Sequence, residues 1–451
     1  MPPEVDVAVI GAGIAGLATA YYLAREAPSC SIAMVDAGEP MAFTSAQSGN
    51  NYRNWWPQPL MVGFMDRSIS LMEQIAQDTG NRIALTRRGY VLASRDADIS
   101  MQHRQLVASL DGRTAKDIRI HDRIEGTGYL PPIRPDWDGA PDGFDFLTDP
   151  ALIRRSFPSL ADDIRSILHV RRAGDVSGQQ LGQVMFEDLR ARGVNLVRGK
   201  VRAIDQCRRF TLTLEAADGR STLVAERLVN VAGPFAAEVA AMLGVSLPLA
   251  NVLQQKVAFP DTARIIPREL PFTIDMDSQM IDWTEEERAI LRADPEAARF
   301  AGMMPGAVHC RPEGGDAGNW VKLGWAYNIE PTAADWHPTL DPRFPEIVLR
   351  GAARLHPALK AYYGKLPRQT HHYGGWYTKT LDNWPLIGPM GPEGAFMVCG
   401  LSGHGTMGAC AGGELVAAWM TGGNLPDWGQ GFSLSRFNGQ EPGRVAEEGL
   451  L

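Results

Sequence analysis

The first segments of the chain alternate between a buried-strand pattern and a helix pattern. Residues 5–10 (VDVAVI) are apolar and β-branched, as expected of a strand that is covered on both faces. A glycine-rich turn follows, and residues 14–26 (IAGLATAYYLARE) have the Ala- and Leu-rich composition of a helix. Residues 31–36 (SIAMVD) form a second apolar run that ends in an acid. These segments predict a βαβ unit.

A similar pattern returns much later in the chain. Residues 178–193 have helical apolar spacing, and strands are expected at 195–203 and 209–216. The apolar run LVNVAG at 228–233 predicts another strand, followed directly by a helix at 235–243. We therefore expect one domain whose sheet is assembled from distant segments.

The remaining periodic segments predict a second region with more strands. Helices are expected at 59–79 and 344–361, and strands at 86–94, 252–260 and 320–328. Residues 113–145 mix Pro, Gly, Asp and aromatic residues without a defensible period, which predicts a long loop or an insertion.

Composition narrows the class of protein. The 451 residues are 45% hydrophobic, and 44 Lys and Arg against 52 Asp and Glu give a net charge of −8, which disfavours nucleic acid as a partner. No apolar run is long enough to cross a bilayer, and no basic segment precedes the first apolar run. The five cysteines form no CxxC pair, so we expect neither a disulfide framework nor a cysteine-only zinc site. No metal is expected, and a reducing cytoplasmic location is predicted.

The first chemical motif is the turn GAGIAG, which contains Gly11, Gly13 and Gly16. Glycines let the backbone approach a pyrophosphate, and the start of the following helix offers unpaired N–H groups. Asp36 ends the next strand, where its carboxylate can accept hydrogen bonds from a ribose. An acid at this position disfavours the 2′-phosphate of NADP, so the turn predicts FAD or NAD.

Four further motifs follow. They are TSAQSGNNYRNWW (44–56), LVNVAGPFA (228–236), GGWYTKTLDNWPLIGP (374–389) and VCGLSGHGTMGACAGGELVA (398–417). Taken in this order with the glycine turn, they resemble the D-amino-acid oxidase-type flavoprotein superfamily. The nearest branch is the sarcosine oxidase β-subunit and dimethylglycine dehydrogenase-like group. The resemblance spans nearly the whole chain and is weakest at 113–143 and 262–310.

The resemblance implies an α/β protein (α+β overall) with two domains. A Rossmann-like FAD-binding domain is expected from residues 1–80, 165–245 and 372–435. A substrate domain with a mainly antiparallel sheet is expected from residues 81–164 and 246–371. Residues 436–451 are expected to form a polar C-terminal tail.

The resemblance also implies which residues contact FAD. Val201 would lay its backbone beside the adenine, and the turn before the last helix would bring backbone N–H groups to the flavin edge that becomes negative on reduction. Some sarcosine oxidases attach the flavin through a cysteine, but Gly375 occupies that position and residues 44–56 contain no His or Cys. Noncovalent FAD is therefore expected. The expected cofactor-binding residues are Gly11, Gly13, Ile14, Ala15, Gly16, Asp36, Ala37, Thr44, Ser45, Ser48, Gly49, Asn50, Val201, Ala232, Gly233, Gly375, Gly400, Ser402, Gly403, Gly405 and Thr406.

Four residues are the catalytic candidates. Arg53 could bind a carboxylate or the flavin edge, or could support its loop through a salt bridge. Lys256 could lie over the flavin face or be an exposed strand lysine. His404 could take part in the chemistry or only fix its turn, and Tyr377 completes the set.

Two departures from the family pattern bear on the substrate. Glycine oxidase-like members carry an Arg near the position of Tyr377, and monomeric sarcosine oxidases carry a Lys at the position of Met407; this chain has neither. A small amino acid held by those two groups is therefore not expected. Aromatic residues near the motifs instead predict a dry pocket for an aromatic or N-alkylated amine: Trp55, Trp56, Trp325, Tyr373, Trp376 and Tyr377.

The leading hypothesis is an FAD-dependent amine oxidase or dehydrogenase. It would transfer hydride from the C–N carbon of a substituted amine or amino acid to flavin N5, and the imine would then hydrolyse. The electron acceptor would be O2 or a redox partner. Two alternatives stay open, namely a 2-hydroxyacid or alcohol dehydrogenase and a non-catalytic flavoprotein that assists assembly.

Overall fold

The computed structural model describes residues 3–110, 117–132, 137–315 and 317–437. Most of the expected tail, from residue 438 onward, lies outside the described residues, as do 113–116 and 133–136 of the expected insertion. Among the described helices, none is both long and apolar enough to span a membrane.

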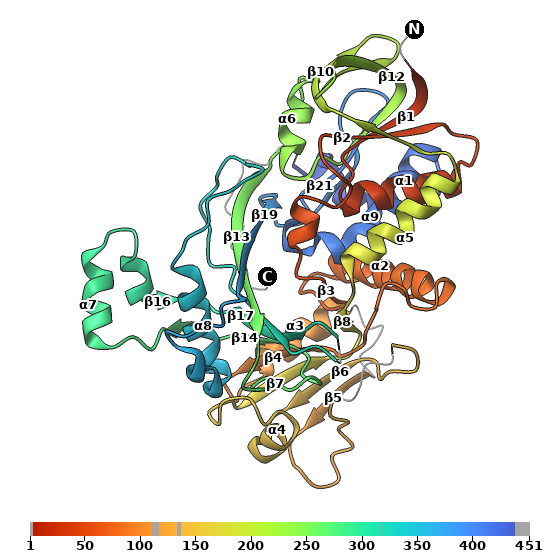
Figure 1. Ribbon diagram of the computed structural model, residues 1–451. Helices are drawn as coiled ribbons and strands as arrows, with labels where there is room; N and C mark the ends of the chain where they lie inside the picture. The colour runs from red at the N-terminus through yellow and green to blue at the C-terminus, as the bar shows by residue number, and fades with distance from the viewer. Residues whose placement is uncertain (1–2, 111–116, 133–136, 316, 438–451) are drawn as a thin grey trace.

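An eight-stranded sheet forms one half of the molecule, at the top of Figure 1. Its strands are β1 (Glu4–Ile10), β2 (Ile32–Asp36), β9 (Asn195–Arg198), β10 (Lys200–Gln206), β11 (Phe210–Ala216), β12 (Gly219–Asn230), β20 (Leu386–Pro389) and β21 (Ala395–Cys399). Strand β1 runs parallel to β2 and β12, and β21 runs parallel to β12. The parallel core confirms the expected Rossmann-like sheet, which is built from the two ends and the middle of the chain.

Four helices pack beside this sheet. They are α1 (Ile14–Glu26), α2 (Pro59–Asp78), α5 (Gly178–Ala191) and α9 (Gly405–Thr421), of which α1 contacts both α5 and α9. Gly413 lets α9 approach α1 closely, because a Cβ there would lie 2.5 Å from the carbonyl carbon of Ala18. Helices α1 and α9, which are far apart in the sequence, therefore pack together beside the same sheet. A short helix, α6 (Ala236–Ala241), follows β12.

A nine-stranded sheet forms the other half, in the order β19-β13-β18-β17-β14-β4-β7-β6-β5. Its strands are β4 (Tyr90–Ser94), β5 (Ile118–His121), β6 (Phe144–Leu147), β7 (Ser166–Val170), β13 (Ala250–Pro260), β14 (Phe272–Asp275), β17 (Val308–Glu313), β18 (Trp320–Gly324) and β19 (His371–Lys379). Within the described part of this sheet, only the β4–β14 and β5–β6 pairs are parallel, which confirms a mainly antiparallel sheet. The expected boundaries at 165 and 372 cut through this sheet, since β7 and β19 belong to it; the division into domains stays a prediction.

The two faces of the nine-stranded sheet differ in polarity. Val257 on β13, Leu323 on β18 and Cys310 on β17 pack in one apolar cluster with helix α8 (Phe344–Leu355). Successive side chains of a strand point to opposite faces, so Lys256 and Lys322 lie on the other face. That face is the one that meets the cofactor half of the molecule.

The structure also corrects several expected elements. Residues 195–203 form two strands, because the chain breaks at Gly199, whose N–H donates to the Asp36 carbonyl at 2.9 Å. This break lets β9 pair with β2 while β10 pairs with β11. The expected loop at 113–145 contains β5 and the start of β6. The other described elements are α3 (Ser100–Ser109), α4 (Pro150–Ser156), α7 (Glu285–Ala293) and the strand pairs β3 (Asn51–Arg53) with β8 (Ala173–Asp175) and β15 (Gln279–Met280) with β16 (Met303–Met304).

Candidate active site

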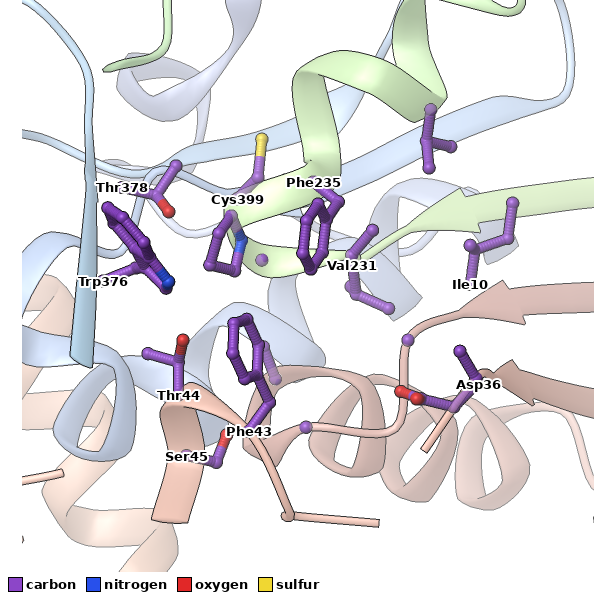
Figure 2. Close-up of a pocket in the computed structure, with 18 of the residues that line it drawn as sticks. Ile10, Asp36, Phe43, Thr44, Ser45, Val231, Phe235, Trp376, Thr378 and Cys399 are labelled. Carbon is purple, nitrogen blue, oxygen red and sulfur yellow. The ribbon is translucent and has the colours of Figure 1, made fainter. Parts of the chain in front are cut away.

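A long cavity, here called the cofactor cavity, runs along the ends of the parallel strands. It encloses about 1250 Å³ of empty space, counting its open mouth. Figure 2 shows Asp36 at one end and Trp376 and Thr378 at the other, with Phe43 and Phe235 facing each other between them. Of the expected cofactor-binding residues, those that line this cavity are Gly11, Gly13, Ile14, Ala15, Asp36, Ala37, Thr44, Ser45, Val201, Ala232, Gly233, Gly400, Ser402 and Gly405.

The glycine turn between β1 and α1 forms one wall. Gly11 has φ of 118°, and a Cβ there would lie 2.4 Å from the Val231 carbonyl oxygen, so the turn can close onto β12 only with glycine. Gly13 precedes α1 and faces the cavity. Gly16 differs from the prediction. It does not line the cavity, and a Cβ there would lie 2.0 Å from the Gly11 carbonyl oxygen, so its role is to pack the helix on the turn.

Asp36 fixes the same turn from the end of β2. Its Oδ2 accepts a hydrogen bond from the Ala12 N–H at 2.6 Å, and its Oδ1 accepts one from the Gly38 N–H at 2.7 Å. Burial raises the pKa of this carboxyl group, and these two hydrogen bonds act in the opposite direction. The carboxylate is thus held rigidly at the end of the cavity where a ribose is expected.

Three aromatic rings cover the middle of the cofactor cavity. The ring centroids of Phe43 and Trp336 are 4.4 Å apart, and those of Phe43 and Phe235 are 5.7 Å apart. Phe43 directly precedes the second motif and Phe235 lies within the third, but Trp336 comes from a non-motif segment of the other half. Reasoning from motifs therefore missed this cover.

A smaller hollow continues the cavity toward the nine-stranded sheet. It shares Ile14, Thr44 and Ser45 with the cofactor cavity. Five more of the residues predicted to contact the cofactor also line it: Ser48, Gly49, Gly375, Gly403 and Thr406. The Thr406 hydroxyl donates to Ser48 Oγ at 2.8 Å and so ties the start of α9 to the second motif. Tyr377 packs closely against Gly403, where a Cβ would be 2.6 Å from its ring.

A third space, here called the substrate pocket, adjoins this hollow. Its walls come from the second motif, the last motif and six strands of the nine-stranded sheet. The described lining residues include no Asp or Glu. They are Ser48, Gly49, Asn50, Asn51, Arg53, Tyr90, Lys256, Phe272, Ile274, His309, Lys322, Tyr377, Gly403, His404, Thr406 and Met407.

The described residues fit FAD. Several buried polar atoms along these spaces lack a hydrogen-bond partner within the protein, namely Thr44 Oγ1, Asn50 Oδ1 and both ring nitrogens of His404. Buried polar groups are normally paired, so such a set indicates a polar ligand. The ribose-facing acid, the glycine turn and the extended cavity suit the adenosine and pyrophosphate, and the adjoining hollow suits the ring.

Comparison with known proteins agrees with an FAD site. The model of the family DAO, described as FAD dependent oxidoreductase, matches residues 6–419. The chain belongs to this family. It is accordingly an FAD-dependent oxidoreductase. No curated protein sequence matches it significantly. The sarcosine oxidase-like branch stays a prediction, since the family model does not distinguish branches.

Solved structures share the oxidoreductase fold along almost the whole chain. L-proline dehydrogenase from P. horikoshii has a TM-score of 0.73 at 18% identity and covers 97% of this chain and 98% of its own. Glycine oxidase from Geobacillus kaustophilus gives 0.70 at 19%, with 96% and 99% covered. Iminodiacetate oxidase from Chelativorans sp. BNC1 gives 0.67 at 18%, with 95% and 98% covered. At these identities the likeness shows the fold.

Arg53 of this oxidoreductase is 2% exposed at the end of β3. Its guanidinium carbon lies 4.5 Å from the ring centroid of Trp56 and 5.5 Å from that of Tyr90. Burial lowers the pKa of Arg53, but an arginine stays charged at neutral pH even so. The structure thus places a fixed positive charge at one end of the substrate pocket.

Lys256 is 4% exposed, which rules out the exposed strand lysine considered above. Its Nζ lies 3.5 Å from the Gln47 carbonyl oxygen and 5.3 Å from the ring centroid of Tyr377. Burial lowers the pKa of Lys256 to about 8. Lys256 borders both the smaller hollow and the substrate pocket, so it is placed where cofactor and substrate would meet.

Two histidines of the oxidoreductase are neutral at pH 7. Burial lowers the pKa of His404 to about 3, and its ring packs edge-on against Trp56 at 5.1 Å. Burial also lowers the pKa of His309 to about 3. Its Nδ1–H donates to the Ala307 carbonyl at 3.1 Å, which leaves Nε2 as a hydrogen-bond acceptor. The sequence analysis missed His309 because it lies where the family resemblance is weakest.

The aromatic residues are more dispersed than predicted. Trp56 lies beside Arg53, and Trp376 lines the cofactor cavity. Trp325 instead packs against Gly351 of α8, on the far face of the sheet, and Trp55 donates from Nε1 to Ser109 Oγ at 3.2 Å in the core. The substrate pocket is thus more cationic and less aromatic than expected.

Proposed function

We propose that this oxidoreductase oxidises the C–N bond of an amino acid or another amine that carries a carboxylate. The observation that carries the proposal is the composition of the substrate pocket. Buried cations line this pocket beside the smaller hollow, and its described lining residues include no acid. When bound, FAD supplies the acceptor for the hydride of the carbon next to nitrogen. Hydrolysis of the resulting imine then completes the reaction.

Arg53 is proposed to bind the substrate carboxylate. The guanidinium offers several N–H donors, and a carboxylate that reaches it forms charge-assisted hydrogen bonds. Stacking on Trp56 holds the donor plane in place, so little side-chain freedom is lost when substrate binds. The substrate carbon would then be oriented toward the smaller hollow.

The pocket also favours an uncharged amine, which hydride removal requires. An ammonium ion would lie among Arg53, Lys256 and Lys322 without an acid from the described lining residues to stabilise it. The neutral His309 can accept a hydrogen bond from the amine at Nε2. The positive pocket thus lowers the pKa of a bound amine while it attracts the carboxylate.

Structural relatives support the same class of reaction. Glycine oxidase, L-proline dehydrogenase and iminodiacetate oxidase are each named for a substrate in which a carbon bonded to nitrogen also carries a carboxylate. More specifically, we propose that the substrate is a secondary or N-alkylated amine, as the sequence motifs suggest.

Oxidation of a 2-hydroxyacid is the second candidate. It needs a group that accepts the hydroxyl proton, and the neutral imidazoles of His309 and His404 at the pocket could do so. A non-catalytic assembly role is the third, and it requires FAD binding without reduction by any substrate.

Anaerobic bleaching of the flavin band, near about 450 nm, tests these alternatives. We expect amino acids and N-alkyl amino acids to bleach the holoenzyme, and hydroxy acids to leave it oxidised. Arg53→Met should raise the half-saturating concentration of carboxylate-bearing amines by about 10- to 100-fold but leave that of their decarboxylated analogues unchanged. Arg67→Met, which removes an exposed arginine paired with Glu414, is the matched control.

Bleaching only by hydroxy acids would overturn the proposal in favour of the second candidate. A flavin that no compound in either panel reduces would favour the non-catalytic role.

A further inference from the structure

Lys322 is a further cation of the substrate pocket, and the proposed reaction assigns it no ligand to bind. It lies on β18, on the polar face of the nine-stranded sheet, and is 6% exposed. Its neighbours Val321 and Leu323 point to the opposite face and pack in the apolar cluster with α8. If this buried position served only for packing, an apolar residue would fill it without the free-energy cost of removing a charge from water.

The pairing of Lys322 makes its charge more unusual. Arg311 on β17 lies directly opposite Lys322 in the antiparallel register, and like charges in that arrangement destabilise a sheet. Glu313 bridges them, with Lys322 Nζ at 2.6 Å and Arg311 at 2.7 Å from its Oε2, and Arg311 also lies 3.4 Å from Asp175. The carboxylates therefore hold the two cations in fixed positions.

Lys322 keeps capacity for a ligand. An ammonium group has three N–H donors, and within the described residues Glu313 is its one ion-pair partner. Lys322 lines the substrate pocket, whereas Arg311 and Glu313 do not. The geometry thus presents an anchored ammonium to the pocket with its acidic partner behind it.

Uncharged residues lie on the strands between Arg53 and Lys322. Arg53 stacks over Tyr90 on β4, and Lys322 lies on β18, three strand spacings away, or about 14 Å between backbones. Phe272, Ile274 and the neutral His309, on the two strands between, line the pocket there. Arg53 and Lys322 both line this pocket with long side chains, so one ligand inside it can contact both.

We propose that Lys322 binds a second carboxylate, and that the substrate is a dicarboxylic amino acid or N-carboxyalkyl amine. This inference rests on the proposed function. The first carboxylate binds Arg53, the second binds Lys322, and the amine between them lies beside His309. A single ammonium at this end matches a carboxylate, for which one charge and up to three donors suffice.

Matched acid and amide pairs test the inference. Glutamate with glutamine, and N-methylglutamate with N-methylglutamine, differ only in the second carboxylate. With the holoenzyme we expect the acid of each pair to half-saturate anaerobic flavin reduction at about 10- to 100-fold lower concentration than the amide. Lys322→Gln should remove this difference by weakening the acid alone, with little change in the limiting reduction rate, and Lys322→Arg should retain it. Lys360→Gln, which removes an exposed lysine paired with Asp282, is the control.

Binding without turnover provides an independent test. Glutarate should perturb the flavin absorbance of the oxidised holoenzyme and raise its melting temperature at lower concentration than glutaramate does, and Lys322→Arg should keep this preference even if Lys322→Gln does not fold. Equal binding of glutarate and glutaramate by the wild type would overturn the second carboxylate site. Equal half-saturating concentrations of glutamine and glutamate for flavin reduction would also overturn the second carboxylate site, but would leave the proposed amine oxidation intact. A preference for glutarate in a protein that no amine reduces would keep the site and refute the proposed function.

Discussion

At the scale of single residues, the clearest feature is an ammonium group buried between the smaller hollow and the substrate pocket. Lys256 is 4% exposed, and burial lowers its pKa to about 8. At pH 7 most of this lysine is still charged, and the charge is lost as the pH rises through 8. A positive charge at this place would stabilise the negative charge that develops on oxygen when reduced flavin reacts with it.

Replacing Lys256 should therefore slow reoxidation. With reduced holoenzyme and dissolved oxygen, we expect the wild-type rate to fall as the pH rises from 7 to 9, with a midpoint near 8. Lys256→Met should be about 100-fold slower at pH 7 and show no such transition. Stopped-flow absorbance measures both.

Two comparisons separate this role from a structural one. Lys256→Arg keeps the charge at all these pH values and should remove the transition while retaining most of the rate. Lys322→Arg should leave the reoxidation profile unchanged. A pH transition that persists in Lys256→Met would show that another group titrates.

At the scale of elements, one segment of the nine-stranded half reaches across to the cofactor cavity. Residues 329–340 leave β18 and are held by two backbone contacts: the Thr332 N–H donates to the Asn251 carbonyl at 2.8 Å, and Trp376 Nε1 donates to the Asp335 carbonyl at 2.9 Å. Trp336 at its tip stacks with Phe43 and Phe235. The segment thus covers the middle of the cavity.

Trp336→Ala should loosen this cover. We expect FAD to dissociate about fivefold faster and its affinity to fall correspondingly, since the aromatic contacts are worth about 1 kcal/mol. The anaerobic reduction rate of FAD-saturated enzyme should change little, because Trp336 does not line the substrate pocket. Flavin fluorescence on dilution measures the dissociation, and Trp428→Phe, away from the cofactor cavity, serves as the control.

The elements also show how far sequence patterns reach. The βαβ unit was predictable because apolar runs, a glycine turn and a terminal acid coincide within a short stretch. The break between β9 and β10 was not, because it depends on where Gly199 meets Asp36 across the sheet. The positions of β7 and β19 in the nine-stranded sheet were not predicted either, since strand pairing between distant segments leaves no trace in local periodicity.

At the scale of the molecule, the same contrast holds for the site. Arg53 and His404 could be found by reading motifs, because each lies in a segment that also approaches FAD. His309 and Lys322 could not, since they come from strands without a motif and meet the others only through the order of nine strands. A polar residue within the apolar run at 320–324 was the one local signal for Lys322.

The cofactor cavity joins three separated parts of the chain, so FAD should stabilise the whole fold. Its wall takes residues from the segments 10–45, 199–242 and 398–405, with Trp336 and Trp376 from the other half. Saturation at about 100 times Kd adds roughly 2.7 kcal/mol, which corresponds to a rise in Tm of about 3 °C for a chain of this size. Calorimetry of apoprotein with and without FAD measures this change.

Fragments of the cofactor should show which end contributes more. ADP should raise the Tm partially, because it fills the end near Asp36, and FMN should raise it less, because the glycine turn and Val201 then stay uncovered. Unfolding should release all the flavin, as expected for a noncovalent cofactor. A Tm that FAD leaves unchanged would contradict a shared cavity, and flavin that stays with the denatured chain would contradict noncovalent binding.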